Sequence, residues 1–264
     1  MQCTKLIGFL HFFSKPSPHR VLEPSQECQT PDADSLPIVL IPGLTCTARL
    51  YAEQIPALWP FGPVTVADHR RDDSIAAVAR RILGAAPQRF ALAGLSMGGY
   101  IAFEIMRQAP QRVAKLALLD TGARADTPEQ TERRHVLMAQ AKAGGYGEIV
   151  DLAYPLYVHR DRHNDAALKS IVGKMIEETG LDAYLRQQQA IIGRPDSRPG
   201  LKAISCPTLV LVGEGDEATP PELAREITSG IPGSRLAVIP GSGHLSTLEK
   251  PDAVNKALIE WVRG

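Results

Sequence analysis

The stretch Arg89-Phe90-Ala91-Leu92-Ala93-Gly94-Leu95-Ser96-Met97-Gly98-Gly99-Tyr100 decides the fold of this chain. Its first residues, 89–93, form a short apolar run, which is typical of a strand buried on both faces. A segment of helical composition follows at 98–109. Between them lies the pattern G-x-S-x-G, with Ser96 at its centre. A strand, a tight turn and a helix in this order are the unit from which parallel sheets covered by helices are built.

The same alternation continues on both sides of this stretch. Apolar runs of strand length occur at 38–41, 64–67, 90–93, 116–119, 208–212 and 236–239. Helical segments occur between and after them, at 74–86, 98–109, 221–229 and 251–262. Ser74 and Pro251 stand where a helix N-cap and a first-turn proline belong. The pattern predicts an α/β fold, with a mostly parallel sheet of about six strands and helices on both faces.

One region breaks the alternation. Between residues 122 and 199 only helical segments are found, at 129–143, 146–157, 165–179 and 182–192. A helical insertion between two strands of a parallel sheet predicts a cap over the carboxyl edge of the sheet, where open α/β sheets bind ligands. We therefore expect a core at 37–121 and 200–264, a helical cap at 122–199, and an irregular, proline-rich extension at 1–36.

Composition limits the partners. The 264 residues carry 29 basic and 29 acidic side chains, and this balance gives no positive field to attract nucleic acid. The apolar run at 6–13 is too short to span a membrane. The cysteines, Cys3, Cys28, Cys46 and Cys206, form no CxxC pair, which favours dispersed free thiols in a cytoplasmic protein, with a Cys3–Cys28 disulfide as the alternative.

Ser96 is the candidate nucleophile. A tight turn forces its backbone into a strained conformation, so the flanking residues must be glycines. The following helix directs its dipole and free N–H groups at an oxygen on which negative charge develops. The alternative is an ordinary glycine-rich turn with a capping serine, but the strand and helix around the motif favour a nucleophile elbow.

A serine hydroxyl needs a base, which predicts a histidine within hydrogen-bond reach. Of the seven histidines, only His244 follows the last predicted strand, in the loop Pro240-Gly241-Ser242-Gly243-His244-Leu245. That loop belongs at the carboxyl edge of the sheet, where Ser96 is also expected. The sequence therefore predicts His244 as the general base.

An acid must orient this histidine. Asp216 follows the predicted strand 208–212, and the glycine before it suits a turn that presents one carboxylate, although Glu214 and Glu217 are neighbours. Asp120, at the end of the strand 116–119, is the second candidate. The sequence favours Asp216 and leaves Asp120 open.

Two backbone N–H groups are expected to hold the oxyanion of the reaction. One belongs to Met97, directly after the serine, and the other to Leu44 in the loop Ile41-Pro42-Gly43-Leu44-Thr45. Gly43 lets the backbone of this loop approach closely. An ordinary strand-ending Pro-Gly turn remains an alternative reading of that loop.

Several motifs together resemble the α/β-hydrolase superfamily over residues 37–264. They are Leu40-Ile41-Pro42-Gly43-Leu44, Gly94-Leu95-Ser96-Met97-Gly98-Gly99, Leu211-Val212-Gly213-Glu214-Gly215-Asp216, and Gly243-His244 followed by Glu249-Lys250-Pro251. The resemblance implies that Ser96, Asp216 and His244 form a catalytic triad. Relatives often have His-Gly where this chain has Pro42-Gly43, a change that keeps the backbone donors. A serine at position 96 argues against the haloalkane dehalogenase branch.

The resemblance implies hydrolysis of a carboxylic ester of a small or medium-sized molecule through an acyl-enzyme. Lactone or C–C bond hydrolysis, perhydrolase activity, and a ligand-binding receptor with slow or no hydrolysis are the alternatives. No cofactor or metal is expected, because no metal-ligand cluster or G-x-G-x-x-G pattern is present in the sequence. The acyl and alcohol groups and the oligomeric state stay open. Met138, Leu152, Tyr157 and Ile191 are the expected cap residues around the substrate.

Overall fold

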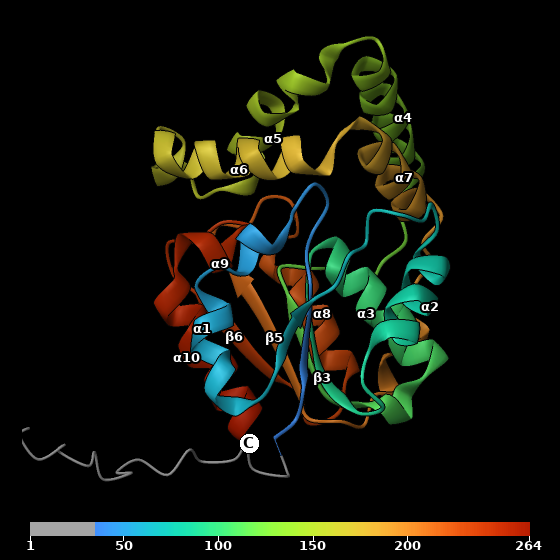
Figure 1. Ribbon diagram of the computed structural model, residues 1–264, viewed down its shortest axis with the longest axis vertical. Helices are drawn as coiled ribbons and strands as arrows, with labels where there is room; N and C mark the ends of the chain where they lie inside the picture. The colour runs from blue at the N-terminus through green and yellow to red at the C-terminus, as the bar shows by residue number, and fades with distance from the viewer. Residues whose placement is uncertain (1–34) are drawn as a thin grey trace, which may run out of the picture. The chain divides into compact units, whose positions relative to one another are not determined.

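A computed structural model describes residues 35–264 of the chain. Most of the predicted extension at 1–36, namely residues 1–34, therefore lies outside the described residues. Cys3 and Cys28 lie outside them as well. The described part is a single sheet with helices on both sides, and a group of further helices stands beyond one end of its strands (Figure 1).

The sheet is parallel throughout. Its strands follow the order β2-β1-β3-β4-β5-β6, and every neighbouring pair runs in the same direction. Their bounds are β1 (Ile38–Ile41), β2 (Val64–Val66), β3 (Phe90–Leu95), β4 (Val113–Leu119), β5 (Thr208–Gly213) and β6 (Arg235–Ile239). The prediction of about six strands is confirmed, and each predicted run coincides with one of them.

The four inner strands β1, β3, β4 and β5 bury both of their faces, because successive side chains point to opposite sides of the sheet, whereas the edge strands β2 and β6 are partly exposed. Leu40, for example, packs into the core that includes helix α10 (Pro251–Arg263), with α1 (Gln54–Leu58) on the same side. Its neighbour Val39 packs into the second core, formed with α2 (Ile75–Ala85), α3 (Met97–Gln108) and α8 (Pro221–Gly230). This two-sided burial explains why the strands are apolar without alternation.

Two predicted helix signals are present in the structure. The Ser74 hydroxyl accepts a hydrogen bond from the Ala77 amide and so caps α2, and Pro251 stands in the first turn of α10. The short helices α1 and α9 (Ser246–Glu249) were not predicted. Each has five residues or fewer, too short for a helical period to stand out in the sequence.

The segment between β4 and β5 is helical, as expected. It contains α4 (Pro128–Lys142), α5 (Ile149–Tyr157), α6 (Ala166–Thr179) and α7 (Leu181–Ile192), with a 3-10 turn at Gly145–Glu148 in place of the first turn predicted for the second helix. These helices lie beyond the carboxyl ends of the strands (Figure 1). Hydrogen bonds tie them to the loops there: the Thr45 amide donates to Gln187 Oε1, and the Leu245 amide donates to the Tyr157 carbonyl.

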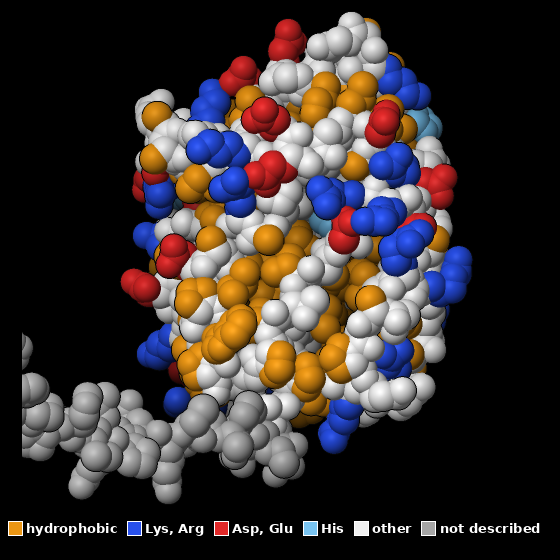
Figure 2. Space-filling view, in the orientation of Figure 1, with side chains coloured by type: hydrophobic (Ala, Val, Ile, Leu, Met, Phe, Trp, Pro, Cys, Tyr) orange, Lys and Arg blue, Asp and Glu red, His pale blue; other side chains and the backbone are white. Residues whose placement is uncertain are grey.

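The surface in Figure 2 divides into two regions. Charged side chains gather over the α4–α7 segment, and hydrophobic side chains gather below it, over α1 and the first strands. None of the helices within residues 35–264 combines the length and the apolar composition that crossing a membrane requires.

Candidate active site

Ser96 stands in a strained turn between β3 and α3. Its φ of 56° and ψ of −116° lie in a region that residues other than glycine rarely adopt. The turn is tight because a Cβ on Gly94 would lie 2.2 Å from the Gly98 carbonyl oxygen, and a Cβ on Gly98 would lie 2.1 Å from that of Ile41. The glycines of the motif are therefore required by close backbone contacts, as the sequence predicts.

Ser96, His244 and Asp216 form a continuous chain of hydrogen bonds. His244 Nε2 lies 2.8 Å from Ser96 Oγ, and His244 Nδ1 lies 2.8 Å from Asp216 Oδ2. The carboxylate accepts from Nδ1, so Nε2 is left without a proton and can accept the proton of the serine. His244 and Asp216 are buried, whereas Ser96 is partly exposed. The three loops that carry these residues meet at the carboxyl edge of the sheet.

Further donors fix the Asp216 carboxylate. The amides of Ala218 and Thr219 both donate to Oδ1, at 2.9 and 2.8 Å, and the Thr219 hydroxyl donates to Oδ2 at 2.7 Å. Sequence reasoning missed Thr219. Its position three residues after an aspartate in a turn is the local signal that could have identified it.

The environment of His244 favours its protonated form. Burial lowers the pKa of the imidazole, but the charge of Asp216 and the hydrogen bond to it outweigh burial, so the pKa of His244 is raised above its ordinary value of 6.5. A base with a raised pKa accepts the serine proton more readily. As the pH falls, however, such a base becomes protonated, and therefore inactive, at a higher pH than an ordinary histidine does.

Asp120, the second candidate for the acid, has other partners. Its Oδ1 accepts from the Gly213 amide at 2.8 Å and its Oδ2 accepts from the Ser246 hydroxyl. Burial, and then the negative charge of Asp216, raise the pKa of Asp120 well above the ordinary value for an aspartate. A neutral Asp120 carboxyl can still link the end of β5 to the start of α9 through these two hydrogen bonds. It does so without placing a second negative charge beside Asp216.

The two amides expected to bind an oxyanion flank the serine. Met97 begins α3, and Leu44 lies in the loop after β1. Neither N–H has a hydrogen-bond acceptor among residues 35–264. A Cβ on Gly43 would lie 3.3 Å from Ser96 Cβ, so this loop lies directly against the serine. Both amides are therefore available to a ligand at Ser96.

A buried polar cluster holds the loop that carries Leu44. Thr45 has a φ of 56°, and its amide donates to Gln187 Oε1 at 3.1 Å. His69 Nε2 lies 2.9 Å from the Gly43 carbonyl oxygen and 3.1 Å from Gln187 Nε2, so it donates to the first or accepts from the second. Burial lowers the pKa of His69 to about 4. No pattern in the sequence links His69 or Gln187 to this loop.

A cavity of about 340 Å³ adjoins the site. Leu44 and Thr45 line it, as does Tyr157, whose ring centre lies 5.5 Å from that of His244. The remaining lining residues come mostly from the α4–α7 segment. Of the four cap residues expected around the substrate, Leu152 and Tyr157 line this cavity. Met138 does not, and Ile191 packs in the core instead.

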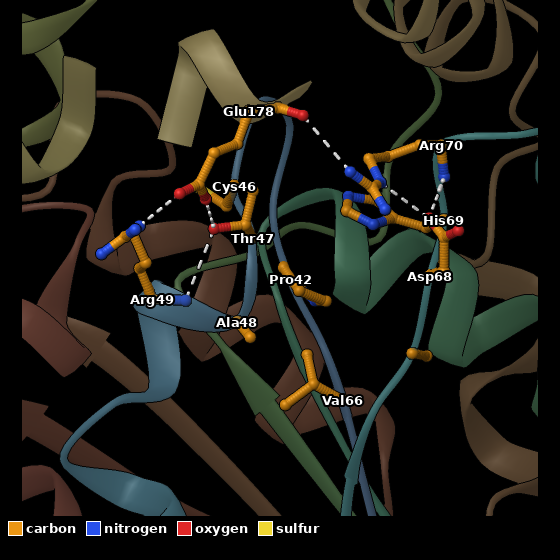
Figure 3. Close-up of a pocket in the computed structure, with 11 residues that line it drawn as sticks. Pro42, Cys46, Thr47, Ala48, Arg49, Val66, Asp68, His69, Arg70 and Glu178 are labelled. Atoms are coloured by element: carbon orange, nitrogen blue, oxygen red, sulfur yellow. Dashed lines mark hydrogen bonds and ion pairs between the residues drawn. The ribbon is translucent and has the colours of Figure 1, made fainter. Parts of the chain in front are cut away.

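A second cavity, of about 570 Å³, is larger but contains none of the three hydrogen-bonded residues (Figure 3). Its charged side chains are already paired, Arg49 with Glu178 at 2.6 Å and Arg70 with Asp68 at 2.8 Å. Burial raises the pKa of the Cys46 thiol to about 12, which removes its reactivity as a thiolate. We therefore assign the candidate chemistry to the smaller cavity.

The arrangement at Ser96 suits attack on a carbonyl carbon. It has a hydroxyl on a strained turn, a base, a carboxylate that orients the base, and two free amides nearby. Among the described residues, no group of three or more His, Cys, Asp or Glu side chains is placed to hold a metal ion.

Comparison with known proteins gives the family. Residues 38–257 match the model of the alpha/beta hydrolase family. The chain belongs to this family.

Three relatives of this hydrolase have assigned activities. A thermophilic esterase from Thermogutta terrifontis, solved with malate bound, is 32% identical with a TM-score of 0.78, over 86% of this chain and 89% of the esterase. The enol-lactonase from Burkholderia xenovorans LB400 is 25% identical with a TM-score of 0.81, over 88% and 93% of the two chains. A pimeloyl-[acyl-carrier protein] methyl ester esterase of Nitrosomonas europaea is 27% identical over 68% of this chain and 74% of its own. These relatives are hydrolases, which supports the conclusion that this chain is an enzyme.

The buried, neutral His69 should make the hydrolase sensitive to acid. Its pKa is about 4 in the folded chain and near 6.5 when unfolded, so the unfolded state binds more protons between these values. The stability contribution of the neutral ring is complete above pH 6.5 and is lost as the pH falls toward 4. Between pH 7 and 4.5 the loss should be about 2 kcal/mol.

Urea unfolding at both pH values, for the natural chain and for His69→Gln, measures this contribution. The variant should lose about 2 kcal/mol less free energy of unfolding on acidification. His135→Gln, which replaces an exposed histidine on α4, should behave like the natural chain. Equal losses in the natural chain and in His69→Gln would contradict the account.

Proposed function

We propose that this chain is a serine hydrolase that cleaves a carboxylic ester of a small or medium-sized molecule through an acyl-enzyme intermediate. The observation that carries the proposal is the unbroken chain of hydrogen bonds from Asp216 through His244 to Ser96, with the serine alone of the three partly exposed. Two of the similar proteins are named as esterases, which supports the choice of an ester.

In the proposed first step, Ser96 Oγ attacks the carbonyl carbon while His244 Nε2 takes the hydroxyl proton. Asp216 stabilises the imidazolium that forms, and the amides of Leu44 and Met97 hold the negative oxygen. His244 then protonates the leaving alcohol as its bond to the carbonyl carbon breaks. In the second step water attacks the acyl carbon while His244 takes its proton. His244 then returns this proton to Ser96 Oγ as the bond between Oγ and the acyl carbon breaks, which releases the acid and the free enzyme.

The proposal also covers the domain boundaries of the chain and its location in the cell. We assign 37–121 and 200–264 to the catalytic core and 122–199 to a cap that encloses the substrate. The hydrogen bonds from Thr45 to Gln187 and from Leu245 to the Tyr157 carbonyl support this, since they join the helical segment to the loops of the site. The cytoplasmic location predicted from the cysteines is part of the same proposal, and Cys46 and Cys206 are free thiols.

Lactone hydrolysis by the same residues is the second candidate. It is favoured by the likeness to the enol-lactonase, because opening a lactone needs the same attack on an ester carbonyl. C–C bond hydrolysis, perhydrolase activity and a receptor role stay predictions from the resemblance of the sequence.

The nucleophile is tested by replacing Ser96 and by labelling it. Ser96→Ala should lower kcat/KM for a 4-nitrophenyl ester by at least about 10³-fold, because only the amides and substrate binding then remain. Its thermal unfolding should stay close to that of the natural chain. A fluorophosphonate probe, located by peptide mass spectrometry, should modify Ser96 alone. An active variant, or a label on a different serine, would refute the proposal.

The acid is tested by a matched pair of substitutions. Asp216→Asn should lower kcat by about 10³- to 10⁴-fold, because the amide no longer holds the histidine in the required tautomer. Asp120→Asn should cost less than about 10-fold, because the neutral amide keeps an oxygen that accepts from Gly213 and its NH2 group can donate to the Ser246 hydroxyl. The opposite ranking would make Asp120, directly after β4, the acid that orients His244.

The pH profile adds an independent measurement. Activity needs neutral His244, whose pKa is raised, so kcat/KM should fall as the pH drops through a value above 6.5. A profile that stays flat to pH 4 would exclude a histidine base.

A further inference from the structure

One side of the cavity beside Ser96 carries more positive charge than the fold requires. The Asp126 carboxylate, whose side chain is only 1% exposed, contacts two guanidinium groups. Arg134 Nε lies 2.6 Å from Oδ2, and Arg194 Nη1 lies 2.5 Å from Oδ1. One negative charge is thus shared by two positive charges, although a buried carboxylate needs only one cation to compensate it.

Arg194 is the partner that serves the fold. Its side chain is buried, its Nε donates to the Arg124 carbonyl, and its guanidinium lies 4.3 Å from the centre of the Tyr100 ring. It does not line the cavity. The Asp126–Arg194 pair therefore accounts for the buried charge without help from Arg134.

Arg134 faces the cavity and has donors to spare. Its Nε and, more weakly, its Nη2 donate to Asp126, and its Nη1 donates to Gln188 Oε1 at 2.9 Å. A guanidinium has five N–H bonds, so two are left for a group in the cavity. Gln188 also donates to the Tyr184 hydroxyl, at 2.9 Å, which fixes this polar side of the cavity in place.

The rest of the lining adds to the imbalance. Arg133 also lines the cavity and has no ion pair within residues 35–264, while Glu217 is the acidic lining residue. The basic lining residues Arg133 and Arg134 therefore outnumber the acidic lining residue Glu217, and Arg194 already compensates the charge of Asp126 outside the lining. Apolar lining comes from Leu137, Ile149, Leu152, Ala153 and Leu156. Such a cavity suits an apolar chain that ends in an anion.

We propose that this cavity recognises a carboxylate at the far end of the acyl group, with Arg134 as the residue that binds it. The inference rests on the proposed function and narrows its substrates to monoesters or lactones of dicarboxylic acids. Leu44, whose amide is assigned to the acyl oxygen, lines the same cavity, so an acyl chain that starts there extends between the apolar side chains toward Arg134. A carboxylate there can accept the remaining N–H bonds of Nη1 and Nη2.

A pair of isosteric substrates tests this assignment. The 4-nitrophenyl monoester of adipic acid ends in a carboxylate, and 4-nitrophenyl adipamate ends in a neutral amide of the same shape. The natural chain should prefer the carboxylate in kcat/KM by about 10- to 100-fold, and this preference should shrink with added salt. Arg134→Gln should remove the preference by slowing the anionic ester alone. Arg134→Lys, which keeps the charge but not the paired N–H geometry, should restore part of it.

Arg80→Gln is the control, since it removes one positive charge from α2, outside the cavity. It should leave the preference unchanged. The inference is overturned if Arg134→Gln slows both esters equally, which would make Arg134 a structural partner of Asp126. It is also overturned if the natural chain does not distinguish the two esters.

Binding separates this inference from the proposed function. Sodium adipate titrated into the Ser96→Ala protein by calorimetry should bind about 10-fold or more tightly than it does when Arg134→Gln is added. If the natural chain hydrolyses neither ester but adipate binding depends on Arg134, the anion site stands and the esterase assignment fails. If the neutral ester is cleaved well and the affinity for adipate is the same with and without Arg134→Gln, the esterase assignment stands and the anion site fails.

Discussion

The left-handed backbone of Ser96 is the constraint on which the rest of the site depends. A non-glycine residue at a φ of 56° needs surrounding structure that holds it there. The Ser96 amide donates to the Leu119 carbonyl, and the Ser96 carbonyl accepts from the Thr121 hydroxyl at 2.8 Å. β4 and the loop after it thus hold both sides of the turn. The glycines of the motif let α3 approach β1 closely enough to bring Leu44 and Met97 beside the same serine.

The second constraint is the distribution of charge around a buried histidine. His244 has Asp216 on one side, and a second carboxyl, Asp120, lies near both. Two negative carboxylates at this depth would repel each other, so the raised pKa of Asp120 keeps it neutral while Asp216 retains the imidazole. His69, which lies against the Gly43 carbonyl, is kept neutral by burial. Asp120 and His69 are thus both held neutral around the hydrogen-bonded pair of Asp216 and His244.

The sequence predicts the strands and the order of the candidate residues because these depend on local patterns. Apolar runs mark β1 to β6, and glycines mark the turn at Ser96. The position of His244 after the last strand follows directly from the order of residues along the chain. The sequence does not predict contacts between distant residues, such as the hydrogen bond from Thr45 to Gln187, which are 142 positions apart. The two arginines around Asp126 were missed for the same reason, since charge spacing alone does not tell which carboxylate a guanidinium meets in the folded chain.

Covalent capture of the acyl group tests the central claim most directly. The reagent 4-nitrophenyl dimethylcarbamate transfers a carbamoyl group that serine hydrolases release slowly, so the intermediate accumulates. Intact-protein and peptide mass spectrometry should find one carbamoyl group per chain on Ser96, matched by one equivalent of released 4-nitrophenolate, and neither in Ser96→Ala. Turnover of esters without any adduct on Ser96, or an adduct on another residue, would contradict the account.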